Sequence, residues 1–208
     1  MAAKRPYLVG LTGSVGMGKS ETAKLFARLG IAVYDADAVV HALYEKDGAA
    51  VEKIAAAFPG SVTDRSVDRA ALARLLRGDE AGFQRLEAIV HPLVAERERA
   101  FVEAAAALGA DIVVLDIPLL YETGKDAGMD AVVVVSAPAE LQRERVLSRP
   151  GMTEERLDQI LSRQMSDAEK RAKAHFVVES DKGLEHAFEQ VKAIVEELRR
   201  RAREKTHA

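Results

Sequence analysis

The chain of 208 residues contains no cysteine, no asparagine and no long apolar run. The lack of cysteine excludes disulfide bonds, thiolate catalysis and cysteine-ligated zinc. The lack of asparagine removes the Asn/Thr-Lys-x-Asp element with which Ras-type GTPases read guanine, and no Thr-Lys-x-Asp occurs either. The apolar runs are too short for a membrane span or a signal-peptide core, so we expect a cytoplasmic protein without a membrane partner.

Neither sign of charge is in large excess: the chain has 30 lysines and arginines and 33 aspartates and glutamates, for a net charge of -3. A dedicated nucleic-acid binder carries a strong basic excess, so we expect no nucleic-acid partner. The 48% hydrophobic and 30% charged residues are typical of a folded soluble protein. At about 150 residues per domain, the length predicts one domain with insertions or two small domains.

Short β-branched runs alternate with helical patterns, which predicts an α/β fold with a five-stranded, mostly parallel sheet flanked by helices. The long stretch at about 37–108 shows no strand signal and predicts a helical insertion, in which Pro92 ends one helix and starts another towards Leu108. A second, arginine-rich insertion covers about 139–173. We expect a single domain over 1–208, with its core at about 6–36, 109–138 and 174–208. The predicted strands are 7–11, 31–34, 112–116, 131–135 and 176–178.

One motif carries most of the chemical information: residues 13–20 fit G-x-x-x-x-G-K-[ST] in full, directly after a predicted strand and before a predicted helix. Its glycines let successive backbone N–H groups point at phosphate oxygens, and the helix amino end adds partial positive charge there. Lys19 is expected to reach the β- and γ-phosphates and Ser20 to ligate Mg²⁺, which predicts a nucleoside triphosphate site. The residues predicted to contact the nucleotide are Gly13, Ser14, Val15, Gly16, Met17, Gly18, Lys19, Ser20 and Glu21.

Acidic residues follow two of the predicted strands, at the edge where ligands of open α/β sheets bind. Asp35 and Asp37 come after the second strand, and Asp116 ends the third as a Walker-B-like acid would. For Asp35 and Asp37 the alternative is that they cap the next helix, and for Asp116 it is a purely structural role. Asp116 is the predicted second metal ligand beside Ser20.

Taken together, these residues resemble the dephospho-CoA kinase family of P-loop kinases. The resemblance covers about residues 8–180 and is specific as a combination, although the phosphate loop alone is shared by many families. Its blocks are Gly10–Gly13, Asp35–Asp37, the Leu-Glu-Ala-Ile-Val-His-Pro-Leu-Val segment at 86–94, the Asp-Ile-Pro-Leu-Leu-Tyr-Glu segment at 116–122, and Gln142, Arg145, Arg149 and Arg163-Gln164.

The resemblance implies transfer of the γ-phosphoryl group of ATP, with Mg²⁺, to the ribose 3′-hydroxyl of dephospho-CoA, which completes coenzyme A. It implies a nucleotide-binding core, a helical CoA-binding subdomain at about 37–108 and a lid at about 139–173. Asp37 resembles the proposed base. Arg145 and Arg149 are four residues apart, so we expect them on one face of a lid helix, where they meet phosphoryl oxygens. The implied acceptor contacts are Asp35, Asp37, His91 and Leu119, with packing as the alternative for His91.

The sequence also departs from the family pattern. Ser14 replaces a usual glycine, Glu21 replaces a common threonine and is expected to point away along its helix, and residues 174–180 lack the usual acidic residue and asparagine. One alternative function is another small-molecule kinase, such as a nucleoside or nucleotide monophosphate kinase. A second is a nucleotide-gated binding protein that contacts RNA through the basic residues 199–205, although cations at a helix carboxyl end also complement its dipole.

Overall fold

The computed structural model describes residues 5–207 and divides the chain into two compact units. The first, here called the core unit, comprises Met1–Tyr34 and Glu103–Ala208. The second, the inserted unit, comprises Asp35–Val102. Among the described residues, none of the helices combines the length and the apolar character needed to cross a bilayer.

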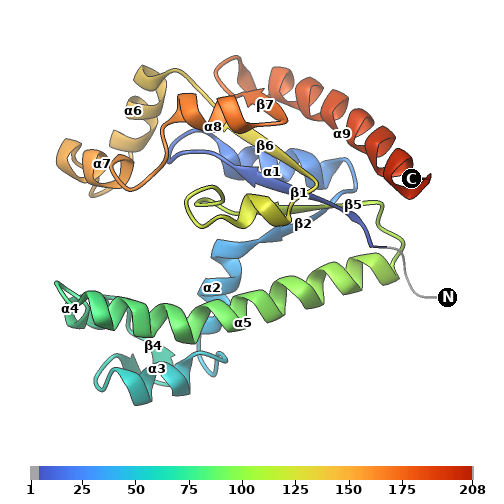
Figure 1. The fold of residues 1–208 in the computed structure, drawn as a ribbon. Coiled ribbons are helices and arrows are strands. Elements are labelled where there is room, and N and C mark those ends of the chain that lie inside the picture. Colours follow the sequence, from blue (N-terminus) through green and yellow to red (C-terminus); the bar gives the residue numbers. More distant parts are fainter. Residues whose placement is uncertain (1–4, 208) are drawn as a thin grey trace. The chain divides into compact units, whose positions relative to one another are not determined.

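The core unit is built on a five-stranded sheet in the order β2-β5-β1-β6-β7, which confirms the predicted α/β fold (Figure 1). The pairs of β1 with β5, β1 with β6 and β6 with β7 are parallel. Every position of β5 and β6 is buried, as expected for strands with both faces covered. The strands are β1 (Tyr7–Thr12), β2 (Ala32–Asp35), β5 (Ile112–Asp116), β6 (Ala131–Ser136) and β7 (Phe176–Glu179).

Two helices, α1 (Lys19–Arg28) and α9 (Gly183–His207), pack side by side on one face of this sheet (Figure 1). The predicted apolar face of the last helix is buried there at Val191, Ile194, Val195 and Leu198. On the opposite face, Leu120 and Met129 approach Gly10. The arginine-rich segment forms three short helices, α6 (Ala139–Leu147), α7 (Glu154–Leu161) and α8 (Asp167–Lys173), and a 3-10 turn, η1 (Lys125–Gly128), precedes β6.

The inserted unit has a hydrophobic core of its own, centred on buried residues such as Leu43, Ile54, Leu72, Val90 and Val94. This core forms because each of its helices turns one apolar stripe inwards. The helices are α2 (Ala36–Tyr44), α3 (Val51–Ala57), α4 (Arg69–Leu75) and α5 (Glu80–Ala107), the last of which ends in the core unit.

Two predictions for the inserted unit are wrong. Pro92 does not separate two helices, because α5 runs through it without interruption. Proline removes one helical hydrogen bond, but burial of Val90 and Val94 on either side of it stabilises the continuous helix. A small antiparallel hairpin, β3 (Val62–Thr63) with β4 (Ser66–Val67), was also not predicted. Its turn residues, Asp64 and Arg65, adopt positive φ without the glycine that usually signals such a turn.

Candidate active site

The carboxyl ends of β1 and β5 meet beside the phosphate loop. In the sheet register Leu11 lies next to Asp116, and the amide of Ile117 donates to the Leu11 carbonyl at 3.0 Å. The chain then turns at Gly13, where a Cβ atom would lie 2.7 Å from the carbonyl oxygen of Val135. Only glycine fits this turn, so the first glycine of the motif is required by packing against β6 as well as by the loop.

The loop turns its carbonyl groups away from the site. Three consecutive carbonyl oxygens accept hydrogen bonds from side chains: Val15 O from Gln142 Nε2 at 2.7 Å, Gly16 O from Arg145 Nη1 at 3.4 Å, and Met17 O from Ser180 Oγ at 2.7 Å. With the carbonyls satisfied outside, the loop can present backbone N–H groups to an anion, which is the arrangement of a phosphate-binding nest.

The amino end of α1 continues this anion site. Gly18 is its N-cap in the left-handed conformation, and no side chain among the described residues caps the helix start. The first N–H groups of a helix have no partner within the helix and carry partial positive charge, so an uncapped start is suited to phosphate. Glu21 accepts from Lys24 at 2.7 Å along the exposed side of α1, in the direction expected from the sequence.

Lys19 forms an ion pair with Asp116, with 2.5 Å between Nζ and Oδ1. Both side chains are largely buried, at 15% and 4% exposure, so the pair is little screened by solvent. Ser20, in the first turn of α1, is exposed. Within the described residues no three acidic or histidine side chains form a ready metal cluster. A hydroxyl, a carboxylate and nucleotide phosphates are nevertheless the oxygen donors that Mg²⁺ prefers, so Ser20 and Asp116 fit this ion.

The two acids after β2 have different surroundings. Asp35 is the N-cap of α2, and its Oδ1 accepts from the Ala38 amide at 2.9 Å, which is the structural alternative considered for it. Asp37 lies in the first turn of α2 and is exposed. Asp35 is therefore engaged by the backbone, whereas the Asp37 carboxylate is accessible to a ligand.

The other residues predicted from the sequence are spread over both units. His91 is exposed on α5, so it does not pack into the core of the inserted unit. Leu119, between β5 and η1, is 39% exposed. Arg149 lies beyond the end of α6 at Leu147, so it does not share a helix face with Arg145 as predicted. The Pro150-Gly151 turn follows directly, and α6 ends two residues before Arg149, the position to which it would have to extend.

Arg145 is already engaged within the core unit. Its guanidinium donates to Ser180 Oγ at 2.9 Å and to the Ser180 carbonyl at 2.8 Å, in addition to the Gly16 carbonyl. It thereby joins α6, the phosphate loop and the segment after β7. The contacts of Ser180, Gln142 and Gln164 with the phosphate loop were not predicted from the sequence. The two glutamines belong to the family pattern, but nothing in the sequence indicated that they bond the loop backbone.

A pocket of about 450 Å³ opens at the carboxyl ends of β6 and β7. It adjoins the phosphate loop, because the amide of Ala137 in its wall contacts the Met17 sulfur at 3.1 Å. Another hollow of similar volume lies between the amino ends of the strands and α9, and no phosphate-loop residue lines it. The lining of the first pocket is Ser136, Ala137, Pro138, Ala139, Asp167, Arg171, Glu179, Asp181 and Lys182.

The chain is similar to known proteins over most of its length. A protein-family model described as dephospho-CoA kinase matches residues 7–186. A dephospho-CoA kinase of Agrobacterium fabrum is 56% identical over 191 residues, which are 92% of this chain and 97% of that protein. One of Mesorhizobium japonicum is 54% identical over 192 residues, covering 92% and 96%.

Solved structures agree on the fold. TT1252 from Thermus thermophilus is 36% identical, with a TM-score of 0.80 over 94% of this chain and 99% of that one. A dephospho-CoA kinase from Campylobacter jejuni is 20% identical, with a TM-score of 0.64 over 94% and 98%. At that identity the second comparison supports the fold alone.

Proposed function

The chain belongs to the dephospho-CoA kinase family, and we propose that it transfers the γ-phosphoryl group of ATP to the ribose 3′-hydroxyl of dephospho-CoA. The products are coenzyme A and ADP, and the reaction is the last step of coenzyme A biosynthesis. The observation that carries this proposal is the phosphate loop itself: an uncapped helix start, carbonyls turned outwards, and a lysine held by the acid at the end of β5.

The phosphate loop and α1 bind the triphosphate of ATP. Lys19 exchanges Asp116 for phosphate oxygens, so its charge stabilises the transferring phosphoryl group. Ser20 and Asp116 would hold Mg²⁺, which would supply positive charge to neutralise the phosphates. The pocket lined by Ser136 and Lys182 takes the nucleoside end of ATP, because it adjoins the loop at the carboxyl edge of the sheet.

The acceptor is handled by residues of the family pattern. Asp37 accepts the proton of the attacking 3′-hydroxyl, a role for which its exposed carboxylate is suited. Asp35 shapes the start of α2 that carries Asp37. His91 and Leu119, which the family pattern assigns to dephospho-CoA, are each exposed and so accessible to a ligand. The inserted unit, which contains most of the range 37–108, would be the CoA-binding subdomain, and residues 139–173 would be the lid.

The partners are therefore small molecules, and the site of action is the cytoplasm, where ATP is available. The cations of the last helix support this view. Arg199 pairs with Asp111 at 3.1 Å, Arg201 with Glu197 at 2.8 Å, and Lys205 with Asp130. Cations that are paired within the protein stabilise the helix end and offer less charge to RNA.

The direct experiment is to mix the purified protein with ATP, Mg²⁺ and dephospho-CoA and to detect coenzyme A. A panel of other acceptors, including nucleosides and nucleoside monophosphates, tests the alternative kinase activities. Preference for one of these acceptors over dephospho-CoA would contradict the proposal.

The role of Asp37 is tested with Asp37→Asn, which keeps the size of the side chain but cannot accept a proton. We expect kcat to fall by about 10²–10⁴-fold with little change in KM for either substrate. Asp35→Asn retains a capping oxygen and is the matched control, with a smaller effect. If Asp37→Asn raises KM for dephospho-CoA at unchanged kcat, Asp37 positions the substrate and is not the base.

A further inference from the structure

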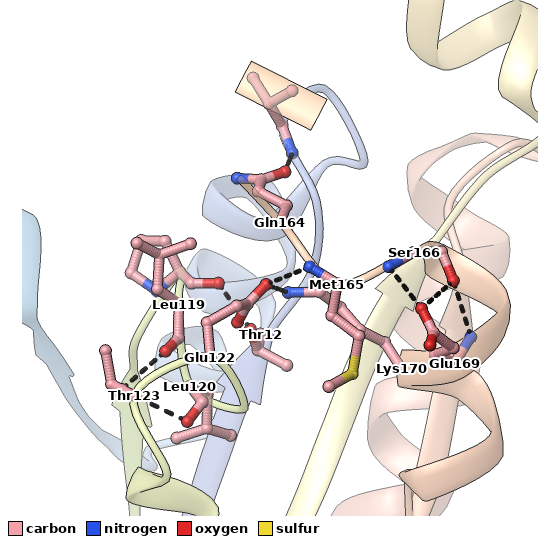
Figure 2. A network of polar contacts seen from close by, with 12 residues as sticks. Thr12, Leu119, Leu120, Glu122, Thr123, Gln164, Met165, Ser166, Glu169 and Lys170 are labelled. Atoms are coloured by element: carbon pink, nitrogen blue, oxygen red, sulfur yellow. Dashed lines mark hydrogen bonds and ion pairs between the residues drawn. The ribbon is translucent and has the colours of Figure 1, made fainter. Parts of the chain in front are cut away.

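The function described above uses neither Glu122 nor Gln164, although both belong to motifs of the sequence. In the structure the two motifs meet (Figure 2). Glu122 Oε1 accepts a hydrogen bond from the Met165 amide at 2.8 Å, and Gln164, the next residue, accepts from the Val15 amide of the phosphate loop at 3.1 Å. A side chain from the segment between α7 and α8 therefore reaches the tip of the loop that binds phosphate.

Val15 is held at both ends of its backbone. Its N–H donates to Gln164 Oε1, and its carbonyl accepts from Gln142 Nε2 at 2.7 Å. The two glutamines come from opposite ends of the lid segment, one from α6 and one from the return towards α8. Two hydrogen bonds to one residue limit how the loop tip can rotate, so its amides keep one orientation before ATP arrives.

The backbone of Met165, the residue after Gln164, contacts a buried ion pair. Lys170 Nζ lies 2.8 Å from Glu122 Oε1, and the Lys170 side chain is fully buried. Burial of the Glu122 carboxyl raises its pKa, but the Lys170 ammonium and the neighbouring backbone amides outweigh this and hold the pKa below its ordinary value. Glu122 is therefore a charged anchor for the segment that begins α8.

The contacts close a ring that starts and ends at the phosphate loop. Thr12, directly before the loop, donates to the Pro118 carbonyl at 2.9 Å. The chain continues from Pro118 to Glu122, crosses to Met165, and returns through Gln164 to Val15. A capping box between Ser166 and Glu169 fixes the start of α8 immediately after Met165. Such a ring determines where Gln164 sits relative to the loop.

We propose that Gln164 is a positioning residue for phosphoryl transfer: it orients the Val15 amide at the tip of the phosphate loop, and the Glu122–Lys170 pair holds Gln164 in place. The inference rests on the proposed function only in so far as the loop binds ATP. Loss of the Gln164 acceptor leaves the loop tip free to adopt other orientations, and ATP binding then has to restore the competent one.

The first test is Gln164→Leu, which preserves much of the side-chain volume and removes the acceptor. We expect kcat/KM for ATP to fall about tenfold, the size of one hydrogen bond, while KM for dephospho-CoA stays unchanged. Gln159→Leu is the matched control, because Gln159 is an exposed glutamine of α7, and it should retain full activity. A kcat/KM for ATP within twofold of the unaltered protein would overturn the proposal.

A second measurement does not depend on the kinase reaction. Hydrogen–deuterium exchange of the peptide that contains Val15 should be faster in nucleotide-free Gln164→Leu than in the unaltered protein and in Gln159→Leu, because a hydrogen bond protects an amide. If dephospho-CoA proves not to be the acceptor, this difference still decides whether the glutamine holds the loop. Equal exchange in all three proteins would refute the contact.

A double-mutant cycle tests whether the two glutamines act through the same peptide group. Because Gln142→Leu releases the other end of Val15, the combined variant should lose less kcat/KM for ATP than the product of the two single losses. Losses that simply multiply would mean that the residues act independently, against the proposal.

The anchor is tested by removing both charges together in Glu122→Gln/Lys170→Met, since Glu122→Gln alone would leave a buried, unpaired ammonium and could fail to fold. The glutamine oxygen can still accept from the Met165 amide. We expect this variant to lose kcat/KM for ATP severalfold, with little further loss when Gln164→Leu is added. Full activity of the folded pair variant would refute the anchoring role.

Discussion

At the scale of single residues, the pairing of Lys19 with Asp116 connects binding to chemistry. The lysine charge is neutralised by a carboxylate that is 4% exposed. A largely buried charge without a partner is costly, so each member keeps the other charged and oriented. In the proposed reaction, phosphate oxygens of ATP would replace the carboxylate at the lysine, and Asp116 would then be available, with Ser20, as an oxygen donor of the kind that suits Mg²⁺.

In the proposed reaction the charge of Lys19 stabilises the transferring phosphoryl group, and Lys19→Ala removes that charge. We expect kcat to fall on the order of 10²-fold or more, measured as coenzyme A formation at saturating ATP. Lys24→Ala is the control, because Lys24 lies on the same helix but pairs with Glu21 at the surface. Near-normal turnover of Lys19→Ala would contradict the assignment of Lys19.

Asp116→Asn weakens the carboxylate contribution to the metal site. We expect a loss of activity that is partly recovered by a higher Mg²⁺ concentration, because the amide oxygen is a poorer ligand than a carboxylate. The measurement is the Mg²⁺ dependence of the rate. An unchanged Mg²⁺ dependence, with the same loss at every concentration, would mean that Asp116 acts only through Lys19.

At the scale of elements, α6 contributes side chains that contact the phosphate loop directly. Arg145 donates hydrogen bonds to both the Gly16 carbonyl and the Ser180 carbonyl, so it ties the phosphate loop to the segment after β7. Arg149, beyond the helix, is exposed. The two arginines, predicted to act as equals on one helix face, therefore have different surroundings.

Arg145→Ala should weaken ATP binding as well as transfer, whereas Arg149→Ala should leave ATP binding nearly unchanged. Arg145→Lys should not restore the loss, since a single ammonium cannot reproduce the planar, multi-donor contact with Ser180 and Gly16. Titration of ATP binding with each variant checks this. Equal binding losses for Arg145→Ala and Arg149→Ala would contradict the structural distinction.

At the scale of the whole molecule, the anchor between Glu122 and Lys170 makes stability depend on pH. The pKa of Glu122 is lower in the folded chain than its ordinary value of 4.5. The unfolded chain therefore binds the proton more readily, so the contribution of Glu122 is present above that value and is lost as the pH falls through the lowered pKa.

The thermal midpoint of the unaltered protein should therefore drop more steeply on acidification below pH 4.5 than that of Glu122→Gln/Lys170→Met. Thermal unfolding followed by circular dichroism across this pH range provides the measurement. If the thermal midpoints of the two proteins fell equally steeply with decreasing pH, the Glu122–Lys170 pair would not govern acid stability.

The sequence by itself determined the features that depend on local chemistry. The five strands follow from short runs of apolar, mostly β-branched residues, and the phosphate loop from glycines whose backbone no other residue readily adopts. The buried face of α9 could be read from the spacing of Val191, Ile194, Val195 and Leu198. Each of these is a property of a few neighbouring residues, so no knowledge of distant contacts is needed.

Only the tertiary structure decided what depends on residues far apart in the chain. α5 continues through Pro92 because packing on both sides of it outweighs one lost hydrogen bond. The Lys19–Asp116 pair spans 97 positions, and Gln164 lies 149 positions from Val15, so no local pattern signals either contact. The loop carbonyls are turned outwards by Gln142 and Arg145 of α6 and by Ser180 after β7, all of which lie far from the loop in the sequence. The phosphate loop could thus be predicted from local sequence, but the side chains that bond its carbonyl groups reach it only in the folded protein.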